Sequence, residues 1–164
     1  MDAEWHRFFR RRARRGGADY RICDYASRRS FEWRQSSVLG WVGRPEGKRI
    51  LDMGCGPGLF VRPWTRDNGV IGLDFVREML TRARARGVAP TQGRAVALPF
   101  ACDAFDVVLC TGVLQHVEDW RSALGELIRV VKPGGSLVVA TLADSAARRI
   151  WYSLAAAVGR GSGL

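Results

Sequence analysis

The sequence lacks the paired cysteines and the long apolar runs that would assign it to several common protein classes. Its four cysteines, at positions 23, 55, 102 and 110, form no CxxC pair and have no histidine at ligand spacing. Neither a zinc site nor a disulfide framework is therefore predicted. No apolar run approaches the roughly 20 residues that span a bilayer, and no apolar segment follows the N-terminal arginines as in a secretory signal. We expect one globular domain in the cytoplasm.

Lysine is also scarce, because arginine outnumbers it by 24 to two in a chain of net charge +10. Residues 1–49 carry 12 Arg and one Lys against six Asp and Glu. This surplus attracts nucleic acid, anionic lipid or acidic proteins, although a solvated basic helix is the simpler explanation of a charge run. We expect residues 1–47 to form a basic helical arm or lid, and residues 48–164 to form the globular unit.

The most informative segment runs from Arg49 to Gly58 and combines a short apolar strand with a glycine-rich turn. Asp52 lies at the carboxyl end of that strand. The glycines let the backbone turn tightly and approach a ligand closely. This pattern predicts a cofactor-binding loop.

Apolar periodicity elsewhere predicts alternating strands and helices. Strands are expected at 49–53, 70–74, 88–93, 105–110 and 136–142, and helices at 2–15, 24–42, 59–67, 76–86, 120–131 and 144–158. Parallel neighbours need crossover helices, which then cover both faces of the sheet. The expected fold is therefore α/β, with a Rossmann-like, doubly wound parallel sheet of about five strands in the order 3-2-1-4-5.

In such a sheet, ligands bind at the carboxyl ends of the strands, where the strand order reverses. Asp74 ends the second strand 22 residues after Asp52, a position from which a carboxylate can accept from both hydroxyls of a ribose. An Asp before a helix also serves as an N-cap, and the two roles are compatible. The spacing predicts a nucleoside-containing cofactor, either a dinucleotide or S-adenosylmethionine.

The glycine pattern separates these two cofactors. The dinucleotide fingerprint GxGxxG needs its third glycine for close packing of helix on strand. Counted from Gly54 that position is Leu59, and counted from Gly56 it is Val61. The fingerprint fails in both frames, which disfavours a nicotinamide oxidoreductase.

Six short motifs, taken in order, resemble the class I S-adenosylmethionine-dependent methyltransferases, in particular the small-molecule group that includes the ubiquinone and menaquinone biosynthesis enzymes. They are ILDMGCGPG at 50–58, GLD at 72–74, LPF at 98–100, FDVV at 105–108, VLQH at 113–116 and RVVKPGG at 129–135. The resemblance covers residues 48–140. It implies S-adenosylmethionine as the cofactor and an enzyme that methylates a small molecule.

The resemblance also assigns positions to the cofactor. Those expected at its methionine part are Asp52, Gly54, Cys55, Gly56 and Gly58. Those expected elsewhere are Asp74 at the ribose, Phe75 on one face of adenine, Ala95 with its backbone amide toward the adenine ring, and Thr111 near the amino group.

Two further assignments concern arginines. The family often has Asp where this chain has Arg94, and a guanidinium offers no acceptor to the adenine amino group. We expect that contact to be lost or remade from the backbone. In the lid, Tyr25 is expected on the inner face, together with Arg28 or Arg29 as a partner for the cofactor carboxylate.

His116 is the weak candidate for a catalytic base, since a neutral imidazole can accept a proton. A supporting role in the loop after strand four is favoured. Methyl transfer from a sulfonium depends chiefly on in-line positioning of the nucleophile, so no catalytic residue is assigned.

The segment Thr111-Gly-Val-Leu lacks the Asn/Asp-Pro-Pro-aromatic motif that similar enzymes use for the amines of nucleic-acid bases. Specific action on nucleic acid is therefore disfavoured. A carboxylate cluster for magnesium is also absent from the sequence.

The predicted function is methyl transfer to a small-molecule acceptor. The alternative is a truncated, catalytically silent cofactor-binding domain that acts on an acidic partner.

After the helix expected over 144–158, only residues 159–164 remain, too few for the antiparallel strands six and seven that this family normally adds. We expect either a sheet of five parallel strands or a fragment of a longer chain, and without the antiparallel strands an edge is exposed, which is a pairing hazard. A homodimer or a partner subunit would cover that edge.

Overall fold

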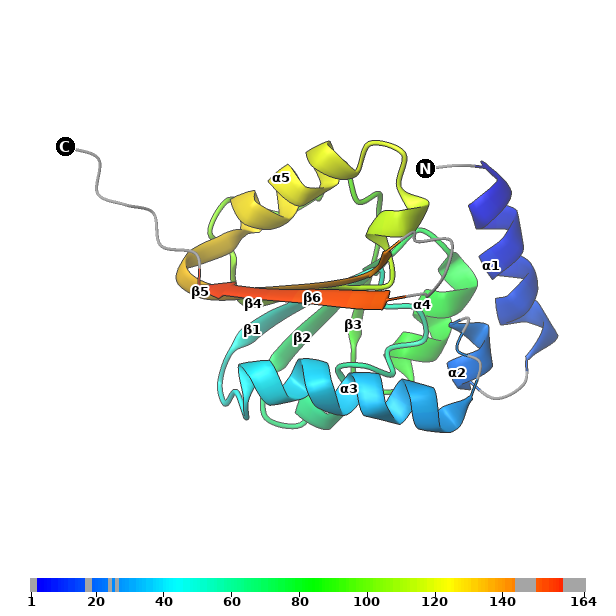
Figure 1. Cartoon of the computed structure of the whole chain (residues 1–164), viewed down its shortest axis with the longest axis horizontal. Coiled ribbons are helices and arrows are strands. Elements are labelled where there is room, and N and C mark those ends of the chain that lie inside the picture. The colour runs from blue at the N-terminus through cyan, green and yellow to red at the C-terminus, as the bar shows by residue number, and fades with distance from the viewer. Residues whose placement is uncertain (1–2, 17–18, 24, 26, 144–149, 158–164) are drawn as a thin grey trace.

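The computed structural model describes residues 3–16, 19–23, 25, 27–143 and 150–157, and shows helices on both faces of a six-stranded sheet (Figure 1). The strand order is β3-β2-β1-β4-β5-β6. The first five strands run parallel, and β6 is antiparallel to β5. The predicted parallel sheet with the order 3-2-1-4-5 is confirmed.

The strands are β1 Arg49–Met53, β2 Gly69–Asp74, β3 Ala89–Gln92, β4 Phe105–Thr111, β5 Val131–Ala143 and β6 Ile150–Ala157. The central strand β1 pairs with β2 on one side and β4 on the other. Ile50, Leu51 and Leu109 are fully buried, because both faces of the sheet are covered. The strand order reverses between β1 and β4, which places a ligand site at their carboxyl ends.

The helices are α1 Ala3–Arg15, α2 Asp19–Ile22, α3 Arg28–Val42, α4 Arg77–Arg84 and α5 Trp120–Val130, with 3-10 helices η1 Arg62–Trp64 and η2 Leu114–His116. Phe31 of α3 and Leu80 of α4 join the core on one face of the sheet. Leu127 of α5 joins the core on the other face. Figure 1 shows α3 and α5 on opposite sides of the sheet, with α1 beside α4. Within the described residues, no helix is long and apolar enough to cross a membrane.

The prediction of one helix over 24–42 is wrong at Tyr25 and Ser27, which are not helical, while residues 24 and 26 lie outside the described residues. The side chain of Ser27 accepts from the backbone N–H of Ser30, and the Ser30 hydroxyl bonds back to the Ser27 backbone N–H. This capping box starts α3 at Arg28 and leaves α2 as a separate short helix.

The helix predicted over 59–67 is replaced by turns and the three-residue η1. Gly58, with φ +74°, packs so closely that an added Cβ would lie 3.1 Å from the Ala83 Cα of α4. Pro63 lies in the first turn of η1. The chain therefore packs directly against α4 as a compact loop, and no long helix follows the glycine-rich turn.

The helix predicted over 144–158 is also wrong where the structure describes it. Residues 150–157 form β6, with Ser136 opposite Ala157 and Ala143 opposite Ile150. The exposed edge of β5 offers backbone partners that local helix propensity does not take into account. One antiparallel strand is therefore present, contrary to the expectation that such strands are missing. Residues 144–149 and 158–164 of the predicted helix and tail lie outside the described residues.

The fifth strand begins at Val131, five residues earlier than predicted. The register between β4 and β5 shifts between Phe105 and Val107. Gly134 has φ +74°, which only glycine adopts readily. The Lys-Pro-Gly-Gly turn is therefore an irregularity within the strand rather than a loop before it.

Candidate functional site

A cavity of about 300 Å³ opens at the carboxyl ends of β1, β2 and β4, beneath the N-terminal helices. Its size falls at the lower end of the range for small-molecule sites. Its floor is formed by residues of these strands and the loops that follow them, and its walls by α1, α3 and the segment between α2 and α3. The residues that line it include Phe9, Cys23, Tyr25, Arg34, Asp52, Gly54, Cys55, Gly56, Asp74, Phe75, Ala95, Thr111, Val113 and His116.

The backbone N–H groups of the glycine-rich loop donate to acceptors within the protein. The N–H groups of Gly54 and Cys55 both donate to Leu73 O, at 2.7 and 3.0 Å, and Gly58 N–H donates to Cys55 O at 2.9 Å. A dinucleotide site instead presents such amides and a helix N-terminus to a pyrophosphate. This loop offers neither, which agrees with the failure of the dinucleotide fingerprint.

Asp74 holds the loop and the start of α4 together. Its Oδ2 accepts from Gly56 N–H at 2.9 Å, and its Oδ1 accepts from Val76 N–H at 2.8 Å. Burial raises the Asp74 pKa to about 6, while the Val76 and Gly56 amides lower it. Each carboxylate oxygen has a further lone pair, so Asp74 can accept from a ligand hydroxyl without giving up either backbone bond.

Asp52 is buried at the end of β1, and neither of its oxygens has a hydrogen-bond partner among the described residues. Burial, and secondarily the charge of Asp74, raises the Asp52 pKa to about 7. A buried carboxylate without donors is costly, and a ligand that brings donors or positive charge would satisfy it. Asp52 is thus the strongest sign that the cavity is built for a ligand.

Gly54 brings the loop against the segment after β4. It has φ +74°, and an added Cβ would lie 2.1 Å from Val113 Cγ2. At Gly56 the nearest atom to an added Cβ is Cys23 Sγ, at 3.4 Å. Both glycines line the cavity, and only Gly54 is excluded from carrying a side chain by direct collision.

A buried arginine lies on the α3 side of the cavity. The Arg34 guanidinium carbon is 5.1 Å from the centre of the Tyr25 ring, and burial lowers the Arg34 pKa while Tyr25 raises it. Burial also raises the Tyr25 pKa to about 12. The pair gives this end of the cavity a positive charge and a hydroxyl, the groups that bind a carboxylate.

Aromatic side chains of α1 close the opposite side. The Trp5 ring lies 4.0 Å from the His116 ring, centre to centre, and the Phe9 ring lies 5.5 Å from it. His6 lies 5.3 Å from the ring of Phe75. This wall separates the space beside His116 and Phe75 from solvent.

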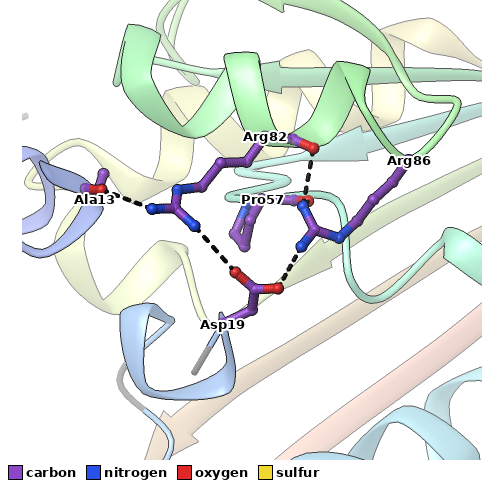
Figure 2. A network of polar contacts seen from close by, with 5 residues as sticks. All are labelled: Ala13, Asp19, Pro57, Arg82 and Arg86. Carbon is purple, nitrogen blue, oxygen red and sulfur yellow. Dashed lines mark hydrogen bonds and ion pairs between the residues drawn. The ribbon is translucent and has the colours of Figure 1, made fainter. Parts of the chain in front are cut away.

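One carboxylate ties the N-terminal helices to the body of the protein, as Figure 2 shows. Asp19 of α2 accepts from Arg82 Nη1 at 3.3 Å and also pairs with Arg86. Arg82 Nη2 donates to Ala13 O of α1 at 3.1 Å, and Arg86 Nη1 donates to Pro57 O of the glycine-rich loop at 3.1 Å. Asp19 thus links α1, α2 and α4 to the loop that lines the cavity.

The structure brings most of the predicted site residues together around this cavity. The ones it brings together are Tyr25, Asp52, Gly54, Cys55, Gly56, Asp74, Phe75, Ala95, Thr111 and the weak candidate His116. Gly58 does not line the cavity, because it packs against Ala83. Arg94 is exposed and forms an isolated bridge with Ala97.

The predicted lid arginines are not at the cavity. Arg28 pairs with Glu32 at 2.7 Å on the outside of α3, and Arg29 is exposed. Arg34 lines the cavity instead, a residue that sequence reasoning missed. A signal was present, because Arg34 lies three residues after Phe31 and four before Val38, on the buried stripe of α3.

Phe9 and Cys23 were also missed. Phe9 lies in the helix predicted at 2–15, and no local pattern shows which distant residues the apolar face of such a helix contacts. Burial, followed by the charge of Asp74, raises the pKa of the Cys23 thiol well above its usual range. The cysteine is therefore an uncharged lining residue at neutral pH.

The fold and this site together define the class I S-adenosylmethionine-dependent methyltransferase architecture. A methyltransferase domain family matches residues 51–139 of the chain. The chain belongs to that family, which confirms the resemblance stated above and S-adenosylmethionine as the cofactor.

Similar proteins include two curated relatives and many solved structures. Identity is 42% over 112 residues with the malonyl-[acyl-carrier protein] O-methyltransferase of Erwinia billingiae, covering 66% of this chain and 45% of that protein. It is 41% over 112 residues with the demethylmenaquinone methyltransferase of Renibacterium salmoninarum, covering 66% and 46%. The structure of an S-adenosylmethionine-dependent methyltransferase from Mesorhizobium loti has a TM-score of 0.60 at 28% identity, covering 74% of this chain and 62% of that one. The chain spans about half the length of the curated relatives it matches.

The residues present fit this cofactor. S-adenosylmethionine carries an ammonium group, a carboxylate, two ribose hydroxyls and an adenine ring. The cavity offers the unpartnered Asp52 carboxylate, the buried Arg34 and Tyr25, and the Asp74 carboxylate. The ammonium group, the carboxylate and the ribose hydroxyls of the cofactor therefore each have a complementary side chain.

Proposed function

We propose that this chain binds S-adenosylmethionine in the described cavity and supports methyl transfer to a small-molecule acceptor. The observation that carries the proposal is the buried Asp52 carboxylate, which has no hydrogen-bond partner among the described residues and lies in the same cavity as Asp74. When bound, the cofactor would supply an electrophilic methyl group. The other contributions below are those of the chain itself.

In this proposal, Asp52 and the loop around Gly54 bind the methionine part, with Arg34 and Tyr25 at its carboxylate. Asp74 binds the ribose hydroxyls while keeping its two backbone bonds. Phe75 and Ala95 hold the adenine ring, and Thr111 lies near the amino group. These assignments follow the resemblance, except that Arg34 replaces Arg28 and Arg29.

The α1 wall excludes water from the acceptor side and orients the acceptor. Trp5 and Phe9 pack on His116, and this contact supports a positioning role for His116 rather than that of a base. Positioning of the nucleophile can supply much of the rate in such a transfer. No residue is proposed as a catalytic base.

The acceptor we propose has a flat apolar ring. One relative is named for a malonyl group on acyl-carrier protein and another for demethylmenaquinone. The aromatic side chains that pack on His116, Trp5 and Phe9, favour a ring acceptor of the second kind. The location expected for such an enzyme is the cytoplasm.

Calorimetry with S-adenosylhomocysteine tests the binding site, and a methyl-transfer assay with a short-chain demethylated naphthoquinone tests the acceptor. We expect binding at tens of micromolar or tighter, and weaker binding by Arg34→Gln. Glu32→Gln, on the outer face of the same helix, is the matched control. Absence of binding would refute the site, whereas binding without transfer would refute only the acceptor.

A second candidate function rests on the outer face of α1. Arg7, Arg11 and Arg15 follow one another at four-residue spacing, are exposed, and have no ion-pair partner in the described part of the chain. This row supports a cofactor-binding domain that acts on an acidic partner, with little or no turnover of its own. Salt-dependent capture of an acidic protein that Arg7→Gln/Arg11→Gln abolishes, without any methyl transfer, would favour it.

A further inference from the structure

The third helix carries a second apolar face that the core does not use. Phe31 and Val38 point inward and are buried. Trp33 and Trp41, by contrast, are 67% and 49% exposed. The irregular aromatic spacing of this segment therefore combines two stripes, one for the core and one directed away from it.

The outer stripe forms a ridge through Trp33, Ser37 and Trp41, at successive four-residue steps of α3. Eight residues of helix separate the two tryptophans by about 12 Å along the axis. The Ser37 hydroxyl between them donates to the Trp33 carbonyl at 2.9 Å, so it is already satisfied within the helix. The ridge thus consists of two exposed indole rings, and the polar side chain between them already has a hydrogen-bond partner in the helix.

Positive charge flanks the ridge at both ends. Arg29 precedes it and Arg44 follows it, and both are exposed without an ion pair to the described residues. Arg28 is neutralised by Glu32. The loop after the helix adds Lys48 against Glu46, so the flanks keep a net positive charge.

We propose that this outer ridge of α3 docks on the surface of an anionic lipid bilayer. Tryptophan rings favour the interface between headgroups and acyl chains, and arginines near that surface are attracted to anionic headgroups. A convex helix ridge with two separated rings fits a flat, soft surface. A second copy of the chain would place Arg29 and Arg44 against their own counterparts, where like charges repel. The proposal does not depend on methyl transfer.

The opposite face of the molecule provides a matched comparison. Trp120 and Ile128 of α5 are 42% and 44% exposed and are also eight residues apart. The Arg121 guanidinium stacks over the Trp120 ring at 4.4 Å, and exposed Glu118 and Asp119 precede that helix. The exposed apolar pair of α5 therefore has acidic residues next to it, which disfavours binding of this face to an anionic surface.

Flotation of the full chain with vesicles tests the proposal, using phosphatidylglycerol mixed with phosphatidylcholine and phosphatidylcholine alone. We expect binding to the anionic vesicles. Trp33→Ser/Trp41→Ser should lower the partition coefficient at least about tenfold, and Arg29→Gln/Arg44→Gln should lower it about fivefold per charge. Trp120→Ser should change it by less than about twofold.

Three results would overturn the proposal. The first is absence of binding to anionic vesicles. The second is that Arg7→Gln/Arg11→Gln loses vesicle binding while Trp33→Ser/Trp41→Ser keeps it, which would show that α1 contacts the bilayer. The third is a dimer in sedimentation that Trp33→Ser/Trp41→Ser converts to a monomer, which would assign the ridge to a second copy. Circular dichroism of each variant confirms that these exposed substitutions leave the fold intact.

Discussion

Asp52 and Asp74 are two buried carboxyl groups in one cavity, and burial, followed by the charge of Asp74, raises the Asp52 pKa to about 7. Their hydrogen bonding differs, because Asp74 accepts two backbone N–H bonds and Asp52 accepts none from the described residues. One carboxylate therefore organises the loop, and the other remains available to a ligand. The first two predictions test this division of roles.

Asp52 should make the cofactor-free protein less stable as the pH rises. In the unfolded chain its pKa is near 3.8, whereas the folded protein holds the proton up to about pH 7. The native state therefore binds more protons than the unfolded state between these values, so the free energy of unfolding falls as pH rises through this window. Asp52→Asn should raise the melting temperature at pH 8 and change it little at pH 4. Melts of the exposed control Asp67→Asn should match wild type throughout, and an equal shift for Asp52→Asn at every pH would contradict the assignment.

Asp74 should contribute to cofactor affinity through the ribose. Asp74→Ala should weaken S-adenosylhomocysteine binding by about 1 to 3 kcal/mol, the cost of leaving buried hydroxyls without a partner. Calorimetry would measure this change, with Asp67→Ala as the control. Because Asp74 also holds the loop, an analogue without ribose hydroxyls separates the two roles. If the variant weakens both ligands equally, the loss comes from the loop and the ribose assignment is wrong.

Gly54 should tolerate no side chain. Gly54→Ala would place its Cβ 2.1 Å from Val113 Cγ2 at φ +74°, and both collision and strain destabilise the fold. We expect a loss of unfolding free energy of at least about 2 kcal/mol by urea denaturation. Gly54→Ala/Val113→Ala should recover part of it, because only the collision is relieved. Gly40→Ala is the matched control, since nothing lies within 4 Å of its added Cβ, and it should stabilise exposed α3 by about 0.5 to 1 kcal/mol.

Local sequence patterns predict the central strands of the sheet and the part of the site that lies at their carboxyl ends. The strands β1 and β4 are largely apolar, and such strands are typical of a parallel sheet that is covered on both faces. Asp52 and Asp74 lie at the carboxyl ends of their strands, so the strand ends are enough to place them at one edge of the sheet. The glycine-rich loop was found in the same way, because its positive φ values need a residue type that is visible in the sequence.

Other features depend on contacts between distant segments. Ile150 to Ala157 has a composition compatible with a helix, and it forms β6 because β5 offers an open edge. Residues 59–67 form turns because Gly58 packs against Ala83. Arg34 was missed because a charged residue in a helix is usually exposed, and only the position of Tyr25 and the cavity explains its burial.

Asp19 links α2 to Arg82 of α4 and to Arg86 in the turn that follows α4. Asp19→Ala removes the carboxylate shared by Arg82 and Arg86, while their bonds to Ala13 O and Pro57 O remain possible. The pairs are partly exposed, so we expect a loss of global stability of no more than about 1 kcal/mol. Local opening of α1 and α2 should become more frequent than in wild type. Such opening breaks only the contacts of those two helices, and Asp19 supplies some of them.

Limited trypsin digestion followed by mass spectrometry would measure that opening, since α1 and α2 contain many arginines. Cleavage within residues 7–21 should be faster in Asp19→Ala than in wild type, with cleavage within residues 49–140 unchanged. Bound S-adenosylhomocysteine should slow the cleavage in wild type more than in the variant, because Phe9 of α1 and Cys23, directly after α2, line the cavity. Glu32→Ala removes an exposed pair within α3 alone and should cleave like wild type. Equal cleavage rates in Asp19→Ala and wild type would show that the aromatic wall of α1 on His116, rather than Asp19, holds these helices in place.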